Sequence, residues 1–277
     1  MKFLLLSDTH LRSTCPIGRK DDFRTTQYNK WKYIINTAIT QNVSAILQAG
    51  DLFDIPSPSL GLITEIAEHL IELKKWDIKF LTIPGQHDQL MRSSDLSRTA
   101  MGVLNKVGLL SVIPDGKFTT EILIVHDMIG NKPLYPGHEI TYAKKYLTSH
   151  PEFDLILCGD YHYPFIEKDG NRIIVNTGCL LRLTRNPDDM FRIPHFYIYN
   201  TEDKSLEKFE IEIPPVEDTF IMSDYKTDEV DRKNVIKLIE RLKNRGVGIG
   251  FLLVLESYCK ENNIDPEIRA VIAEALE

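Results

Sequence analysis

The chain has 277 residues, of which 43% are hydrophobic and 26% charged, and its net charge is −7 at pH 7. This length accommodates one large α/β domain with a small appendage, and the composition is that of a globular protein. The negative charge excludes a general electrostatic attraction to nucleic acid, although a local basic rim around a site remains compatible with it.

Short apolar runs and amphipathic helices alternate over residues 2–84. The runs at 3–6, 45–47 and 80–83 are rich in branched residues, as expected for buried strands. Helices are predicted over 29–41 and 60–75, where apolar residues recur at helical spacing. The alternation of strand and helix predicts a parallel sheet.

The pattern changes after residue 110. Segments 117–125 and 154–199 contain short strands separated by turn signals, which predicts a second sheet that is mixed or antiparallel. Residues 193–213 are expected to form two strands joined near 200–204. Pro214-Pro215 marks the predicted boundary between a catalytic domain, 1–213, and a small helical appendage, 214–277, with helices over 229–243 and 266–276.

No apolar run approaches the ~20 residues of a membrane span, so we expect no membrane partner. The chain enters its first strand directly after Met1-Lys2, and no signal segment is expected. The four cysteines are scattered and form no Cys-x-x-Cys pair. This usage predicts a reduced, cytoplasmic setting.

Metal-binding side chains follow five of the apolar runs. The motifs are Asp8-Thr9-His10, Gly50-Asp51-Leu52-Phe53-Asp54, Gly85-Gln86-His87-Asp88 and Gly159-Asp160-Tyr161-His162, with His126 standing alone. Residues beyond the carboxyl ends of parallel strands share the crevice where open α/β sheets bind ligands. Taken singly, each motif is more often an ordinary turn or strand end. Taken together and in this order, they predict a dinuclear metal site.

The predicted ligands are Asp8, His10, Asp51, Gln86, His126, Asp160 and His162. Imidazole and oxygen donors suit manganese, iron or zinc, and the large carboxylate share favours manganese or magnesium. Asp51 is the natural bridge, because its two oxygens can serve two cations. Two metals about 3.5–4 Å apart can bind both the attacking and the leaving oxygen of a phosphate ester.

Three further residues have possible roles beside the metals. If Gln86 is a ligand, His87 is free to donate a proton to the leaving oxygen, with Asp88 fixing its orientation. Asp54 is a candidate for orienting a ligand from behind. The alternative for both Asp54 and Asp88 is that they only cap or orient loops.

The order of these motifs resembles the calcineurin-like metallophosphoesterase superfamily over about residues 1–200. Asp8-Thr9-His10-Leu11 and the motif at 50–54 are most similar to SbcD-type DNA nucleases, which partner SMC-like ATPases. The segment 176–183 is similar to a strand and loop of those nucleases, with Cys179 where serine is usual.

The resemblance implies a four-layer α/β/β/α sandwich of two mixed sheets. It implies that the first metal is held by Asp8, His10, Asp51 and His162, and the second by Asp51, Gln86, His126 and Asp160, with His87 facing the scissile phosphate. Gln86 and Asp160 depart from the family's usual Asn and His. One side chain is longer and the other shorter, so the two changes can compensate in one reshaped site; the alternative is a weakened second site.

The resulting prediction is a manganese-dependent DNA nuclease acting in recombination, repair or replication. Arg12, Arg182 and Arg185 are the predicted DNA contacts. The resemblance implies that the appendage helices can bind an SbcC-like ATPase partner, and the alternative is that they pack on a core of their own. A homodimer is a further expectation. Two alternatives stay open. One is a phosphodiesterase or phosphatase for small molecules, and the other is a DNA-end-binding scaffold without catalysis.

Overall fold

The computed structural model describes residues 1–134 and 138–222. Residues 1–132 and 139–220 form one compact unit. The second unit comprises 133–138 and 221–277, and in its described part the amide of Leu134 donates to Nδ1 of His138 at 3.2 Å. The helices predicted over 229–243 and 266–276 lie outside the described residues.

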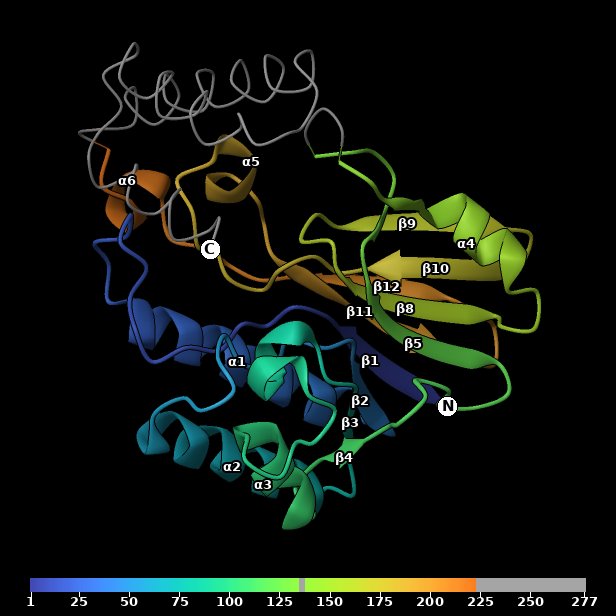
Figure 1. Ribbon diagram of the computed structural model, residues 1–277, viewed down its shortest axis with the longest axis horizontal. Coiled ribbons are helices and arrows are strands. Elements are labelled where there is room, and N and C mark those ends of the chain that lie inside the picture. The colour runs from blue at the N-terminus through green and yellow to red at the C-terminus, as the bar shows by residue number, and fades with distance from the viewer. Residues whose placement is uncertain (135–137, 223–277) are drawn as a thin grey trace, which may run out of the picture. The chain divides into compact units, whose positions relative to one another are not determined.

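A mixed sheet of six strands is the centre of the first unit, in the order β12-β11-β1-β2-β3-β4 (Figure 1). Neighbours from β1 to β4 pair in parallel, and β11 and β12 complete the sheet in antiparallel register. The strands are β1 (Lys2–Leu6), β2 (Ala45–Gln48), β3 (Lys79–Thr82), β4 (Ser111–Val112), β11 (His195–Asn200) and β12 (Leu206–Glu210).

Three helices cover one face of this sheet: α1 (Phe23–Thr40), α2 (Leu60–Lys75) and α3 (Ala100–Lys106). Leu4 and Leu6 of β1 point into this helix layer and share its core with Trp31 of α1 and Ile66 of α2. Helix α1 begins six residues before the predicted start at 29, because Asp22 caps it by accepting from the amide of Thr25. Helix α2 has the predicted bounds.

The other face of the first sheet packs on a second sheet, in the order β5-β8-β10-β9. Phe3 and Leu5 point the opposite way from Leu4, and share a core with Leu155 of β8 and Val175 of β10. Strands β5 (Ile122–Asp127), β8 (Leu155–Asp160) and β10 (Arg172–Asn176) are parallel, and β9 (Phe165–Asp169) is antiparallel to β10. Helix α4 (Ala143–Ser149) contacts β9 and β10 and forms the fourth layer.

The four-layer sandwich of two mixed sheets is therefore confirmed. Short elements complete the unit: β6 (Ile129–Gly130), β7 (Thr141–Tyr142), α5 (Pro187–Met190) and α6 (Val216–Thr219). Residues 214–220 follow the predicted boundary yet belong to this unit, and Phe220 is buried in it. A separate appendage beyond them stays a prediction. Among the described helices, none combines the length and apolarity needed to cross a bilayer.

Candidate metal centre

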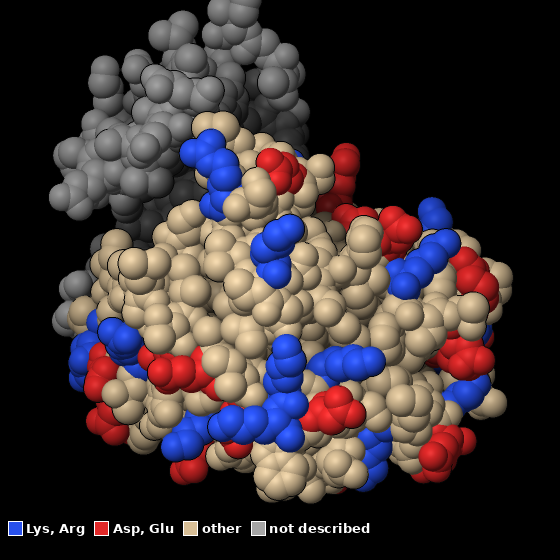
Figure 2. Space-filling model, turned by 90° about the horizontal axis from the view of Figure 1, so that it is seen from below, with Lys and Arg blue, Asp and Glu red and all other residues tan. Residues whose placement is uncertain are grey.

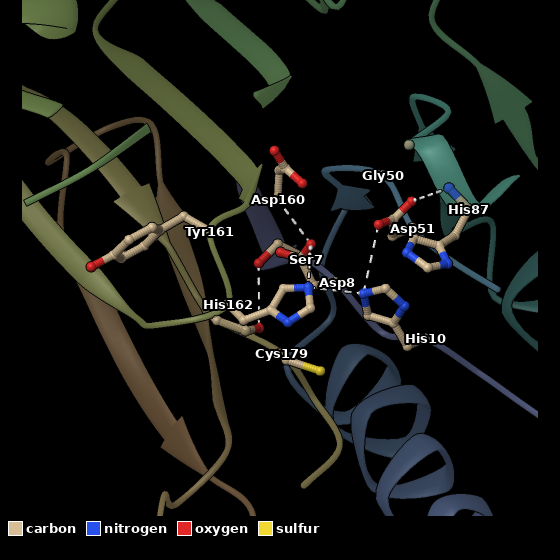
Figure 3. A network of polar contacts seen from close by, with 12 residues as sticks. Ser7, Asp8, His10, Gly50, Asp51, His87, Asp160, Tyr161, His162 and Cys179 are labelled. Atoms are coloured by element: carbon tan, nitrogen blue, oxygen red, sulfur yellow. Dashed lines mark hydrogen bonds and ion pairs between the residues drawn. The ribbon is translucent and has the colours of Figure 1, made fainter. Parts of the chain in front are cut away.

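Loops at the carboxyl ends of strands from both sheets meet in one cluster (Figure 3). Four of its residues have left-handed backbone angles that are unusual for residues other than glycine: Asp8 (φ 41°), His10 (φ 43°), Asp51 (φ 52°) and Asp160 (φ 80°). Such strained positions concentrate at functional sites. Gly50 (φ 80°) is required as well, since a Cβ there would lie 2.5 Å from Nδ1 of His126.

The first group of donors surrounds His10. Its Nε2 lies 3.1 Å from Nε2 of His162 and 3.6 Å from Oδ2 of Asp51, and His162 Nε2 lies 3.9 Å from Oδ1 of Asp8. Donors bound to one ion at about 2.0–2.2 Å lie about 3–3.5 Å from one another. The spacing of this group is therefore close to that of a common ligand set.

The second group surrounds His126. Its Nε2 lies 3.3 Å from Oδ2 of Asp51 and 2.9 Å from Oε1 of Gln86, whose Nε2 donates to Oδ1 of Asp160 at 2.6 Å. The longer Gln86 side chain thus reaches the shorter Asp160, and the two departures from the family pattern are in direct contact.

Asp51 joins the two groups through a single oxygen. Oδ2 faces both His10 and His126, whereas Oδ1 accepts from the amide of His87 at 2.8 Å. Oδ2 is the oxygen that faces both groups, and the bridging of two cations by Asp51 stays a prediction.

The electrostatics of the cluster suit divalent cations. Asp8 and Asp51 are 0% exposed, and Oδ2 of each lacks a hydrogen-bond partner in the described part of the chain. Burial of these carboxylates carries a desolvation cost that a bound cation offsets. Burial alone would raise the pKa of Asp51, but the neighbouring His126, whose Nε2 lies 3.3 Å from Oδ2, holds this pKa below its ordinary value. Burial lowers the pKa of His126, and Asp51 and Asp8 outweigh it, raising this pKa to about 10.

Asp54 lies behind His10, and its role as an orienting carboxylate stays a prediction. Its Oδ1 is 3.6 Å from Nδ1 of His10, and its Oδ2 is 3.4 Å from Nη1 of Arg12. A carboxylate at the second nitrogen of a histidine ligand fixes the ring orientation. Arg12 is thereby tied to this pair, and its contact with substrate stays a prediction.

His87 and Asp88 are adjacent but have separate partners. Nδ1 of His87 lies 2.8 Å from the carbonyl of Asp54, and its ring packs edge to face with His10. Asp88 is buried and accepts from the amides of Leu52, Phe53 and Gly85 at 3.0–3.2 Å. The prediction that Asp88 orients His87 is therefore wrong: it joins the loops after β2 and β3.

The prediction that Arg182 contacts DNA is also wrong. It is 0% exposed and donates to the carbonyls of Met190 and Pro214 and to the hydroxyl of Thr219. A side chain enclosed in this way holds the fold together and cannot bind substrate. Arg185 is half-buried, with its aliphatic part against Gly18, and its DNA contact stays a prediction.

The sequence did not reveal that buried cations hold the loop at 179–182. Lys30 donates to the carbonyl of Leu180 at 3.2 Å, Arg192 to that of Leu181 at 2.7 Å, and Arg19 to that of Arg182 at 2.7 Å. Lys30 lies on the buried side of α1. A lysine among the apolar residues of a helix face was the one feature of the sequence that could have indicated a buried basic group.

Donors of this kind, gathered at strand ends of a four-layer sandwich, define a metal-dependent phosphoesterase. The sequence profile of the calcineurin-like phosphoesterase family matches residues 1–164, and the chain belongs to this family.

Curated relatives with sequence similarity are DNA double-strand break repair proteins Mre11. That of Saccharolobus solfataricus is 31% identical over 115 residues, covering 41% of this chain and 29% of the relative. That of Archaeoglobus fulgidus is 33% identical over 115 residues, covering 41% and 24%. The chain thus matches less than a third of the length of these relatives.

Two solved structures are distantly similar. An archaeal phosphodiesterase has a TM-score of 0.47 and 18% identity, covering 76% of this chain and 100% of its own. Zinc-complexed Vps29 from Entamoeba histolytica has a TM-score of 0.40 and 14% identity, covering 76% and 98%.

Lys30 makes stability depend on pH. Burial, with the nearby charges of Arg182, Arg192 and Arg19, lowers its pKa from 10.5 to about 7. Above pH 7 the unfolded chain holds a proton that the folded chain has released, so stability rises with pH. We expect the free energy of unfolding of the wild type, relative to Lys30→Met, to rise by about 1 kcal/mol per pH unit above neutrality in urea titrations. Lys32→Met, at an exposed position of α1, is the control, and its unfolding free energy should differ from that of the wild type by the same amount at every pH. A difference between the wild type and Lys30→Met that does not change with pH would contradict the prediction.

The contact between Gln86 and Asp160 predicts coupled mutational effects. Gln86→Asn and Asp160→His should each lower manganese affinity about tenfold in calorimetric titration. The double variant should recover at least about 1 kcal/mol of the summed loss, because it restores the usual pair of donors. Gln89→Asn, a neighbouring glutamine outside the cluster, should bind manganese like the wild type. Additive losses in the double variant would show that the two positions act independently.

Proposed function

We propose that this protein is a manganese-dependent phosphodiesterase that cleaves DNA. The observation that carries the proposal is the position of Asp51 Oδ2 between His10 and His126, which joins two donor groups beside the exposed His87. A shared ligand atom suits two neighbouring ions, and such pairs assist displacement at phosphorus. Similarity to Mre11 repair proteins supports DNA as the substrate.

Seven side chains would hold the two ions, with Asp8, His10 and His162 on one side, Gln86, His126 and Asp160 on the other, and Asp51 shared. When bound, the ions supply charge stabilisation to the phosphate and a nucleophile at neutral pH. The mixture of carboxylate, amide and imidazole donors favours manganese.

His87 is the proposed proton donor. A carbonyl oxygen only accepts, so the contact with Asp54 assigns a proton to Nδ1 of His87. Nε2 is then the atom that takes up and releases a proton, and it can protonate the departing oxygen when the ring is charged. Asp51 fixes the position of His87 by accepting from its amide, and Asp54 fixes its ring.

The proposed nucleic-acid partners are DNA ends, either double- or single-stranded. The proposal further includes an SbcC-like ATPase as a protein partner, a homodimer and a cytoplasmic location. Figure 2 shows one face of the molecule, on which lysine and arginine gather at the lower centre with acidic residues among them and along the rim. This mixture suits local phosphate contacts more than a continuous basic surface.

The test is manganese-dependent cleavage of end-labelled linear duplex and single-stranded DNA, beside bis-p-nitrophenyl phosphate. We expect DNA cleavage by the wild type and a loss of about 10²–10⁴-fold in His87→Ala, with metal binding unchanged in calorimetry. His69→Ala on α2, outside the metal cluster, is the matched control and should retain full activity.

Two outcomes would contradict the proposal. Turnover of the small ester without DNA cleavage would establish the phosphodiesterase for small molecules. Binding of DNA ends without cleavage of either substrate would establish the scaffold.

A further inference from the structure

Cys179 lies beside the first donor group and has no part in the function proposed above. It follows β10, is 3% exposed, and its side chain lies next to the rings of His10 and His162 (Figure 3). One nitrogen of each ring and Sγ of Cys179 all lie within 4.8 Å of one another. Three donors from separate segments thus approach one point.

The backbone around Cys179 is tied to two of the predicted ligand segments. The amide of Cys179 donates to the carbonyl of His162 at 3.1 Å, and the amide of Leu180 donates to the carbonyl of Asp8 at 3.0 Å. Arg192 donates to the carbonyl of Cys179 itself, and Lys30 to the next one. The sulfur is therefore held in place beside the histidines by bonds on both sides of the residue.

The sulfur of Cys179 differs from the other described sulfurs in its surroundings. Sγ of Cys158 donates to the carbonyl of Val175 at 3.5 Å, and Sγ of Cys15 donates to that of Pro16 at 3.5 Å. Sγ of Cys179 instead has the imidazoles of His10 and His162 beside it and the backbone of Leu181 as a hydrogen-bonding neighbour. In the same cluster, Oδ2 of Asp8 is buried and has no hydrogen-bond partner among the described residues. A buried thiol grouped with two imidazoles and an unpartnered carboxylate oxygen has the composition of a metal-ligand set.

We infer that Cys179 is a thiolate ligand of the first metal ion, together with His10 and His162. On binding, the thiol proton leaves to solvent and a sulfur–metal bond forms. Thiolate is a soft donor, so this ligand makes the first site select zinc or ferrous iron over magnesium. The second group has only imidazole and oxygen donors and keeps its suitability for manganese. The inference rests on the metal centre of the proposed function and is independent of whether DNA is the substrate.

The test is a titration of the metal-free 277-residue chain with Co²⁺, followed by absorption spectroscopy. Visible ligand-field bands report that cobalt binds, and a near-ultraviolet charge-transfer band reports a thiolate bound to it. We expect both in the wild type, and loss of the charge-transfer band alone in Cys179→Ser. Serine is usual at this position in the SbcD-type nucleases that the chain resembles, so this variant is expected to fold.

A single-thiol protein provides the matched control. The triple variant Cys15→Ser, Cys158→Ser, Cys259→Ser leaves Cys179 as the one cysteine of the four and should retain the charge-transfer band. Two further measurements are expected to agree. Zinc binding to Cys179→Ser should release one proton fewer in calorimetry across buffers, and its zinc affinity should fall at least about tenfold with magnesium affinity nearly unchanged.

The outcomes separate this inference from the function on which it rests. Ligand-field bands without a charge-transfer band in the wild type would overturn the role of Cys179 and leave the metal centre intact. A charge-transfer band that persists in Cys179→Ser would also overturn it. Absence of any cobalt band would overturn the metal centre and the thiolate ligand together.

Discussion

Two buried carboxylates at the ends of parallel strands govern how the surrounding loops and side chains are arranged. Asp8 and Asp51 follow β1 and β2, are completely buried, and each retains an oxygen without a hydrogen-bond partner among the described residues. Such charges persist in a fold only if cations or donors surround them. The left-handed loops and the histidines from two sheets all place positive or donor groups around these two side chains.

The packing of the two sheets against each other brings these metal-binding side chains together. A single sheet would supply Asp8, Asp51 and Gln86 from one row of strand ends, whereas His126, Asp160 and His162 come from the second sheet. Hydrogen bonds join the two rows: the amide of Asp160 donates to Asp8 Oδ1 at 2.9 Å, and the amide of Ser7 donates to Thr177 Oγ1 at 2.9 Å. The shared apolar core between the sheets fixes the distance over which the donors meet.

Some charged residues near the motifs belong to the donor cluster, and others hydrogen-bond to the backbone of the loops that carry it. Arg19, Lys30 and Arg192 bind backbone carbonyls of the loop at 179–182, and the buried Arg182 binds carbonyls of more distant segments. The buried guanidinium groups are tolerated there because each is hydrogen-bonded, which offsets part of its desolvation, whereas burial lowers the pKa of Lys30 to about 7. The loop that they fix carries Cys179, so these side chains act on the metal centre through the backbone that they hold.

The alternating strands and helices of residues 2–84 could be predicted from the sequence, because apolar periodicity follows from local rules. The four layers followed from the resemblance of the motifs to a known family, and the positions of these motifs after strands indicated which side chains could cluster. The tertiary structure decided the pairings between distant residues. Gln86 and Asp160 are 74 residues apart, Lys30 and Leu180 are 150 apart, and nothing local to either partner specifies these contacts. The same holds for Asp88, whose carboxylate accepts from amides of another loop, and for Oδ2 of Asp51, which faces His10 and His126. Side-chain type fixes what a residue can bind, but only the folded chain fixes which carbonyl, amide or imidazole is within reach.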